Sequence, residues 1–304
     1  MQSRYISTNQ IRLHVVEAGP TDGPLVILLH GFPEFWYGWR HQIDALAAAG
    51  FRVWAPDQRG YNLSDKPQEI KAYTLDKLGA DILGLMDAAG VQRATVVGHD
   101  WGGGVAWWLA INHPERLHRV VCLNMPHLSV MPQVMRKNPQ QLLRSWYIGF
   151  FQLPVLPEWL VRLGNWWGAT RALRGTSRPG TFSAADLVQY RQAWAQPGPT
   201  GQPAIQTMIN WYRALVQQGP QLPDNPRVTV PLLLIWGTRD QALIRELAQP
   251  SIELCDRGKL VYIEEATHWV QHEAPDRVNR LIINFAGQKA EDSDELRNAR
   301  PQNS

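Results

Sequence analysis

The sequence predicts a doubly wound α/β fold with a mostly parallel sheet and an inserted helical cap. Two observations predict it. Up to about Pro126, short β-branched runs alternate with helical stretches, and strand-like runs then disappear until about position 231. Alternating strands and helices are typical of βαβ units, whose strands lie parallel. With 304 residues, the chain is long enough for a single core that carries an insertion.

Each expected strand is a short apolar run, and each expected helix carries apolar residues at helical spacing. Strands are expected at residues 25–30, 51–55, 94–98, 119–124, 231–236 and 259–263, and helices at 39–49, 74–89, 103–112 and 275–286. Thr74 is a candidate N-cap of the helix at 74–89, and Gly90 follows that helix. Cys122 lies in an expected buried strand far from Cys255, so neither a disulfide nor a metal site is expected.

We divide the chain into four parts on these patterns. Residues 1–128 and 226–287 are the two parts of the α/β core, and residues 129–225 between them are the helical cap, rich in Trp, Tyr, Gln and Pro. Residues 288–304 are a polar tail without apolar periodicity, which we expect to be mobile and without function.

Composition and charge give no sign that the partner is a nucleic acid or a membrane. The formal net charge is +3, and no dense run of Lys and Arg suggests binding to nucleic acid or to a membrane. The N-terminus lacks the apolar stretch of a signal peptide, and no apolar run approaches the roughly 20 residues of a membrane span. We therefore expect a cytoplasmic monomer or homodimer that uses no cofactor and no metal.

The segment most informative about chemistry is residues 95–104, TVVGHDWGGG, in which a strand runs through glycines into a helix. Its Gly-x-Asp-x-Gly form is typical of the sharp turn that lifts a nucleophile above a sheet. Gly98 and Gly102 relieve crowding there, and the helix N-terminus favours negative charge on Asp100. An aspartate that only caps the helix has the same pattern, so this motif alone leaves both interpretations open.

Three further segments follow expected strands, at the edge where open α/β sheets hold their sites. In residues 29–34, LHGFPE, the backbone N–H of Phe32 can pair with that of Trp101 as an oxyanion hole. Residues 234–240 end at Asp240, and residues 265–269 contain His268. Singly, Asp240 can be a helix cap and His268 a structural histidine. Together, the order nucleophile, acid, histidine favours a catalytic triad.

A carboxylate nucleophile narrows the reaction. It is a poor acyl acceptor but displaces a leaving group from saturated carbon, which indicates epoxides or alkyl halides. The product is an ester on Asp100. Water activated by His268, with Asp240 orienting the imidazole, would hydrolyse that ester.

Four motifs, HGFPE at 30–34, DQRGY at 57–61, GHDWGG at 98–103 and HWVQ at 268–271, resemble those of epoxide hydrolases of the α/β-hydrolase superfamily. The resemblance runs from about Arg4 to Ala286. It implies an α/β-hydrolase fold, a cis peptide before Pro33, and an enzyme that converts a small lipophilic epoxide and water into a vicinal diol. It also implies that the cap residues Tyr147 and Tyr212 protonate the epoxide oxygen; without it, they would be interpreted as anchors of cap helices.

The cap also carries aromatic residues that either form a pocket for a lipophilic substrate or pack as cap core. They are Trp146, Phe150, Phe151, Trp159, Trp166 and Trp167.

Two alternatives remain beside epoxide hydrolysis. The first is a dehalogenase of the same fold. Against it, haloalkane dehalogenases usually have Asn where this chain has Phe32, and fluoroacetate dehalogenases typically have Arg where it has Trp101. A non-catalytic member of the fold that binds a small molecule is the alternative of another class, although the chain keeps every catalytic group. A serine esterase is set aside because no Ser stands at position 100.

Overall fold

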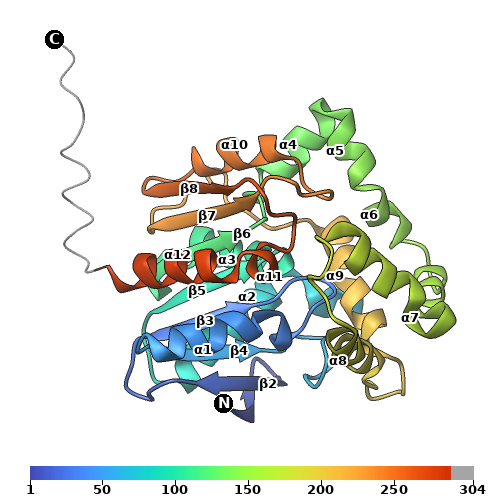
Figure 1. Cartoon of the computed structure of the whole chain (residues 1–304), viewed down its shortest axis with the longest axis horizontal. Helices are drawn as coiled ribbons and strands as arrows, with labels where there is room; N and C mark the ends of the chain where they lie inside the picture. The colour runs from blue at the N-terminus through green and yellow to red at the C-terminus, as the bar shows by residue number, and fades with distance from the viewer. Residues whose placement is uncertain (289–304) are drawn as a thin grey trace.

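An eight-stranded sheet forms the centre of the computed structural model, which describes residues 1–288 (Figure 1). The strand order is β1-β2-β4-β3-β5-β6-β7-β8. The strands are β1 Gln2–Thr8, β2 Ile11–Ala18, β3 Leu25–Leu29, β4 Arg52–Pro56, β5 Ala94–His99, β6 Leu117–Leu123, β7 Leu232–Gly237 and β8 Gly258–Ile263. The six strands from β3 to β8 pair in parallel, which confirms the predicted mostly parallel sheet.

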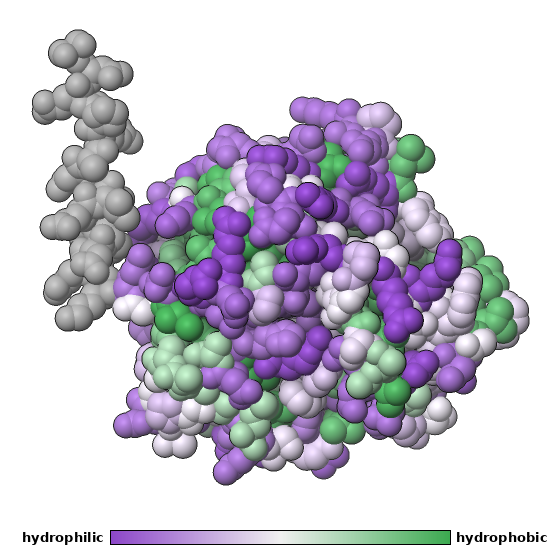
Figure 2. All heavy atoms as spheres, viewed as in Figure 1, coloured by the Kyte–Doolittle hydropathy of each residue, from purple (hydrophilic) through white to green (hydrophobic). Residues whose placement is uncertain are grey.

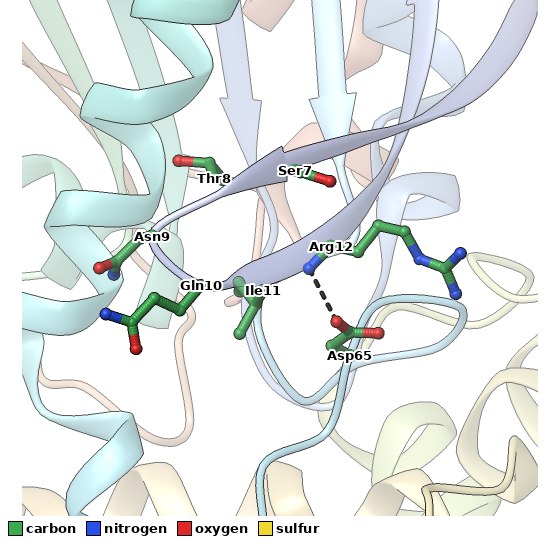
Figure 3. Close-up of a pocket in the computed structure, with 7 residues that line it drawn as sticks. All are labelled: Ser7, Thr8, Asn9, Gln10, Ile11, Arg12 and Asp65. Carbon is green, nitrogen blue, oxygen red and sulfur yellow. Dashed lines mark hydrogen bonds between the residues drawn. The ribbon is translucent and has the colours of Figure 1, made fainter.

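An N-terminal hairpin precedes these strands and was not among the predicted elements. β1 pairs antiparallel with β2, and β2 pairs antiparallel with β4. Asn9 and Gln10 turn the chain at φ angles of 45° and 63°. Figure 3 shows this turn beside a surface hollow of about 580 Å³, where the Arg12 backbone N–H donates to Asp65 Oδ2 at 2.8 Å.

Helices cover both faces of the sheet. Along β3, Val26 and Leu28 join the apolar cluster that contains residues of α1 and α12, while Ile27 and Leu29 join the cluster beneath α2 and α3. This alternation follows from the two-residue period of a strand. The main helices are α1 Arg40–Ala48, α2 Leu75–Ala88, α3 Trp101–Asn112 and α12 Pro275–Gly287, each close to its predicted range. Shorter helical segments are η1 Trp36–Trp39, η2 Ile70–Tyr73, η3 Pro114–Arg116, η4 Arg245–Leu247, α10 Ala248–Ile252 and α11 Val270–Glu273.

One predicted helix cap is wrong. Thr74 stands at the N-cap position of α2 with extended backbone angles, but its side chain makes no capping hydrogen bond. Its hydroxyl instead donates to the carbonyl of Lys71 at 3.4 Å, because the preceding helical turn η2 brings that carbonyl close. At the other end of α2, Gly90 has a φ of 73°, as expected for a glycine just past a helix.

Six helices lie between β6 and β7 in the sequence, and Figure 1 shows α5–α9 gathered at one side of the sheet. They are α4 Val130–Lys137, α5 Pro139–Arg144, α6 Trp146–Phe150, α7 Leu156–Thr176, α8 Ala184–Ala195 and α9 Ala204–Gln218. Cap and core are joined by hydrogen bonds, among them Trp211 Nε1 to the Arg59 carbonyl at 3.0 Å and Trp194 Nε1 to the Pro33 carbonyl at 2.6 Å. The residue boundaries that we drew for the four parts stay predictions.

Cys122 and Cys255 are both free and buried, as predicted. Within residues 1–288, no helix combines the length and apolar character needed to cross a bilayer. The predicted polar tail lies, from residue 289 onward, outside the described residues.

A buried ion pair joins the loop after β4 to α2. Arg59 donates to both carboxylate oxygens of Asp81, at 2.8 and 2.6 Å, and Asn9 donates to the same carboxylate at 2.8 Å. Arg59 is 5% exposed and Asp81 is 2% exposed. Removing one charge from a buried pair leaves the other uncompensated in a medium of low dielectric constant.

We therefore expect Asp81→Asn to lower the free energy of unfolding by about 3 to 5 kcal/mol. The exposed pair Arg227–Asp256, which meets at 2.7 Å, provides the control, and Asp256→Asn should cost less than about 1 kcal/mol. Urea unfolding followed by circular dichroism measures both values. Equal losses would contradict the proposed dependence on burial.

Candidate active site

Asp100 stands at the junction of β5 and α3 in a strained backbone conformation, with φ at 50° and ψ at −122°. The surrounding backbones are very close. A Cβ atom on Gly98 would lie 2.2 Å from the Gly102 carbonyl oxygen, and one on Gly102 would lie 2.1 Å from that of Leu29. Both positions therefore require glycine, as predicted. The Asp100 side chain makes no capping hydrogen bond to α3, so the interpretation of Asp100 as a simple helix cap is wrong.

Two groups hold the Asp100 carboxylate. The Phe32 backbone N–H donates to Oδ1 at 2.8 Å, and His268 Nε2 lies 3.5 Å from Oδ2. The Phe32–Pro33 bond is cis, as the resemblance implied. Trp101 begins α3, where the first N–H groups of a helix lack intrahelical partners. Its backbone N–H makes no hydrogen bond to Asp100 within residues 1–288, so its place in an oxyanion hole stays a prediction.

Asp240 holds the other side of the imidazole. Its Oδ2 lies 2.6 Å from His268 Nδ1 and accepts a hydrogen bond from Asn124 Nδ2 at 2.8 Å. Its Oδ1 accepts from the backbone N–H groups of Ala242 and Leu243, at 2.7 and 2.9 Å. Asp240 therefore caps a turn and not a helix, and its proposed role in orienting His268 stays a prediction that this contact supports. Asn124 escaped the sequence analysis because only the fold brings it to Asp240.

Charge on these buried groups is strongly coupled. Burial alone would lower the pKa of His268, but the negative charges of Asp240 and Asp100 and their hydrogen bonds hold it well above its ordinary value. Burial alone would raise the pKa of Asp240, but the His268 charge and the hydrogen bonds from His268, Leu243 and Asn124 hold it below. The negative charges on both sides of the ring thus favour the protonated form of His268.

Tyr147 of α6 and Tyr212 of α9 meet above this triad. Their ring centroids are 5.8 Å apart, and the Tyr212 ring lies 5.2 Å from Phe32 and 5.0 Å from Trp101. Burial and the negative charge of Asp100 raise the pKa of both phenols, so both stay protonated at neutral pH. The structure thus brings all seven predicted site residues together.

The six aromatic residues of the cap have different environments. Phe151 faces the site, because its ring lies 5.6 Å from Phe32 and 5.0 Å from Tyr212. Trp166 packs in the cap core, 5.7 Å from Trp194. Phe150 is partly buried between Trp146 and Phe151. The tryptophans Trp146, Trp159 and Trp167 are 65%, 55% and 63% exposed, so for them both predicted roles, pocket wall and cap core, are wrong.

A second buried network lies behind the triad and was missed from the sequence. Glu34, 1% exposed, accepts hydrogen bonds from Tyr190 at 2.6 Å and Gln271 at 2.9 Å, and lies 3.1 Å from His99 Nδ1 and 2.7 Å from His272 Nε2. Burial alone would raise the pKa of Glu34, but the two histidines hold it well below its ordinary value. Glu34 and His99 belong to motifs quoted above, yet only the fold shows that they meet.

This network reaches both the triad and the cap. His99 Nε2–H donates to the His268 carbonyl at 2.9 Å, which fixes the backbone that carries the imidazole. On the far side, Arg40 donates to His272 Nδ1 at 3.0 Å and lies 3.4 Å from Asp186 of α8. Glu34 thus couples the position of His268 to the docking of α8.

Comparison with known proteins gives the family. The family model described as "alpha/beta hydrolase fold" matches residues 24–275. The chain belongs to the α/β-hydrolase family. This α/β-hydrolase is 47% identical over 94% of its length to the AB hydrolase superfamily protein YfhM of Bacillus subtilis, and covers 98% of that protein. It is 36% identical over 93% of its length to epoxide hydrolase A of Mycobacterium tuberculosis, of which it covers 96%.

Solved structures of epoxide hydrolases are similar to this α/β-hydrolase. A point mutant of an epoxide hydrolase from Bacillus megaterium, complexed with its propanediol product, superposes with a TM-score of 0.82 at 30% identity. The match covers 94% of this chain and 100% of the other. The α/β-hydrolase fold and the resemblance to epoxide hydrolases are therefore confirmed.

We expect Asp100→Asn to lower the pKa of His268, because it removes one of two negative charges that stabilise the imidazolium. Asp240→Asn removes the shorter contact and should also lower it. NMR titration of the His268 imidazole measures the effect. Asp256→Asn, in the exposed pair with Arg227, is the control, and it should leave the His268 pKa unchanged. If Asp100→Asn also left it unchanged, Asp100 and His268 would not interact as described.

Proposed function

We propose that this α/β-hydrolase converts lipophilic epoxides into vicinal diols through an ester on Asp100. One observation carries the proposal: the carboxylate of Asp100 lies between a buried His268–Asp240 pair and two phenols held together above it. A carboxylate nucleophile and an acid for the departing oxygen are the two groups that epoxide opening needs. Family membership supports the proposal.

In the first step, an Asp100 oxygen attacks an epoxide carbon while the C–O bond to that carbon breaks. The departing oxygen becomes an alkoxide unless it is protonated. An aliphatic alcohol is about as weak an acid as water, whereas a phenol is ordinarily a much stronger acid. Tyr147 or Tyr212 therefore supplies the proton, and its phenolate is stabilised by the other phenol.

In the second step, water attacks the carbonyl carbon of the Asp100 ester. His268 takes the proton of that water, Asp240 stabilises the resulting imidazolium, and the Phe32 N–H donates to the oxyanion. Trp101 N–H is the second proposed donor. When the tetrahedral intermediate collapses, its hydroxyl proton passes to the departing diol oxygen, and the site is left with Asp100 restored and His268 protonated.

Ester formation itself prepares His268 for its role as base. The ester of Asp100 carries no charge, so one of the two groups that raise the pKa of His268 disappears. The imidazolium then passes its proton to the phenolate formed in the first step, and neutral Nε2 faces the ester while Nδ1–H donates to Asp240. The base is thus released only once there is an ester to hydrolyse.

Several features favour epoxides over the alternatives. A halide leaves without a proton, so a dehalogenase has no use for two phenols above Asp100. The positions occupied by Phe32 and Trp101 also differ from those of the dehalogenases named above. A binding protein without catalysis would not need a strained nucleophile turn. The aromatic side chains of Phe32, Phe151 and Trp101 surround Tyr212 and give this part of the site an apolar character that suits a lipophilic substrate.

The cytoplasmic location expected from the sequence stays a prediction.

A side-by-side turnover assay tests the assignment, with styrene oxide, a haloalkane, fluoroacetate and a simple ester as substrates. We expect diol formation from the epoxide to dominate, and Asp100→Ala to abolish it while thermal unfolding stays cooperative. Halide release that exceeds diol formation would assign the chain to the dehalogenases instead. Full epoxide turnover by Asp100→Ala would remove Asp100 from the mechanism.

We expect His268→Gln to accumulate the ester, because loss of a general base slows hydrolysis by about 100- to 10,000-fold while the attack of Asp100 continues. Intact-protein mass spectrometry should show a gain equal to the mass of the epoxide. The double variant Asp100→Ala/His268→Gln is the control and should gain nothing. A variant saturated with epoxide that stays unmodified would argue against a covalent intermediate.

We expect Tyr147→Phe/Tyr212→Phe to slow single-turnover epoxide opening by about 100-fold or more, since it removes the general acid. Tyr37→Phe/Tyr73→Phe removes two partly or fully buried phenols elsewhere and should change the opening rate little. Rapid-quench measurement of the Asp100 ester gives the rate directly. Unchanged opening in the first double variant would exclude the two phenols as proton donors.

A further inference from the structure

An exposed apolar surface covers α5, α6 and α7. We call it the cap surface and define it by six side chains that are each more than half exposed, Leu143, Trp146, Val155, Trp159, Leu163 and Trp167. Figure 2 shows apolar side chains at the edge of the molecule over α5 and α7. None of the six is in the catalytic group described above.

The cap surface is a concentration of exposed apolar residues. Fifteen large apolar side chains are exposed within residues 1–288, and ten of them lie between positions 142 and 167. Single exposed apolar residues are normal on a protein surface, but a contiguous patch indicates an interaction site. Three of the ten are tryptophans, the side chain that prefers the boundary between water and lipid.

The cap segment that carries this surface is rich in basic residues, and three of them, Arg162, Arg171 and Arg174, are exposed on α7 itself. Residues 129–180 contain seven basic side chains and one acidic side chain, whereas the whole chain has a net charge of only +3. The single acid, Glu158, is buried and paired with Arg213 at 2.7 Å, so it does not offset the surface charge. The basic residues are spaced along the sequence, which is why no cluster was apparent there. They are Arg136, Lys137, Arg144, Arg162, Arg171, Arg174 and Arg178.

A hollow at the end of α7 combines both properties. It has a volume of about 750 Å³ and is lined by Trp167, Arg171 and Arg174 among others. The Arg171 guanidinium lies 5.4 Å from the centroid of the Trp167 ring. Neither Arg171 nor Arg174 forms an ion pair with another side chain in the part of the chain that the structure describes. Two guanidinium groups without an ion-pair partner, beside the Trp167 ring, suit an anionic headgroup attached to an acyl chain.

A second copy of the chain would be a poor occupant. In a two-fold interface the same patch meets itself, so the exposed arginines of α7 on one copy would lie close to those of the other. An anionic lipid surface has the complementary charge and an apolar interior for the tryptophans. Apolar side chains beside Lys and Arg are the pattern of segments that lie in a membrane interface without crossing it.

We propose that the cap surface docks this protein peripherally on an anionic lipid bilayer. This inference goes beyond the proposed function and does not depend on it. It differs from our expectation from composition that no membrane partner exists. It also has a consequence for delivery, because α6 carries Trp146 on the cap surface and Tyr147, the next residue, at the catalytic group. A lipophilic molecule dissolved in the bilayer would then be one helix away from Asp100.

Sedimentation of the full chain with lipid vesicles tests the proposal. We expect binding to phosphatidylcholine vesicles that contain phosphatidylserine, weak binding to phosphatidylcholine alone, and weaker binding at high salt, because salt screens exposed charges. Equal binding to both kinds of vesicle, or to neither, would overturn the proposal.

Two pairs of variants locate the surface. Arg171→Gln/Arg174→Gln should lower the vesicle partition coefficient about 30-fold, since each basic residue near a bilayer contributes about a factor of five. Lys259→Gln/Arg280→Gln removes two exposed charges from the core and should change it less than about twofold. Trp159→Ser/Trp167→Ser should lower it about tenfold or more, and the control Leu63→Ser/Val216→Ser should not.

The same variants separate lipid from a second copy as occupant. Analytical ultracentrifugation without vesicles should give the same mass for the parent chain and for Trp159→Ser/Trp167→Ser. A dimer that dissociates on this substitution would overturn the proposal in favour of self-association. Cooperative thermal unfolding checks that each variant is folded, and the arginine pair keeps the test decisive if the tryptophan pair is not.

Discussion

The turn between β5 and α3 is so closely packed that a Cβ atom on Gly98 or Gly102 would clash with neighbouring backbone, and this packing holds Asp100 in place. The contacts of Phe32 and His268 with the nucleophile depend on this position of Asp100. Phe32 follows β3, which lies beside β5, and His268 follows β8. Because these strands are parallel, both residues lie at the same edge of the sheet and reach the carboxylate. The strain in the Asp100 backbone is stabilised by this packing, so the nucleophile is placed before any substrate arrives.

Electrostatics then gives the fixed groups their chemistry. His268 and Asp240 are buried and Asp100 is largely buried, so the pKa values of His268 and Asp240 depend on the charges of neighbouring groups. A change of charge at one of these groups therefore changes the pKa of its neighbours. Conversion of the Asp100 carboxylate to an ester is such a change. The two phenols supply an acid. They are protonated at rest, and their proton is needed only while the epoxide ring opens.

Local patterns predicted much of this structure. The apolar runs of the parallel strands and the Gly-x-Asp-x-Gly turn are local signals, and order along the chain was enough to pair Asp240 with His268. The N-terminal hairpin gave a weaker signal because β1 is mostly exposed and polar. Glu34, Asn124 and His99 were missed because their roles arise from contacts between segments up to about 240 residues apart. The failed Thr74 cap had a local cause, since a preceding helical turn offers a competing acceptor.

The Glu34 network has a consequence for protein engineering. Tyr190 and Asp186 belong to the cap, while Glu34, His272 and Arg40 belong to the core, and together they form one continuous hydrogen-bonded assembly. A chimera that replaced the cap with that of a relative would exchange two members of this assembly and keep the other three. Such a graft would disturb the placement of His268 even if every triad residue were retained. Caps of this family are thus best transplanted together with their partners around Glu34.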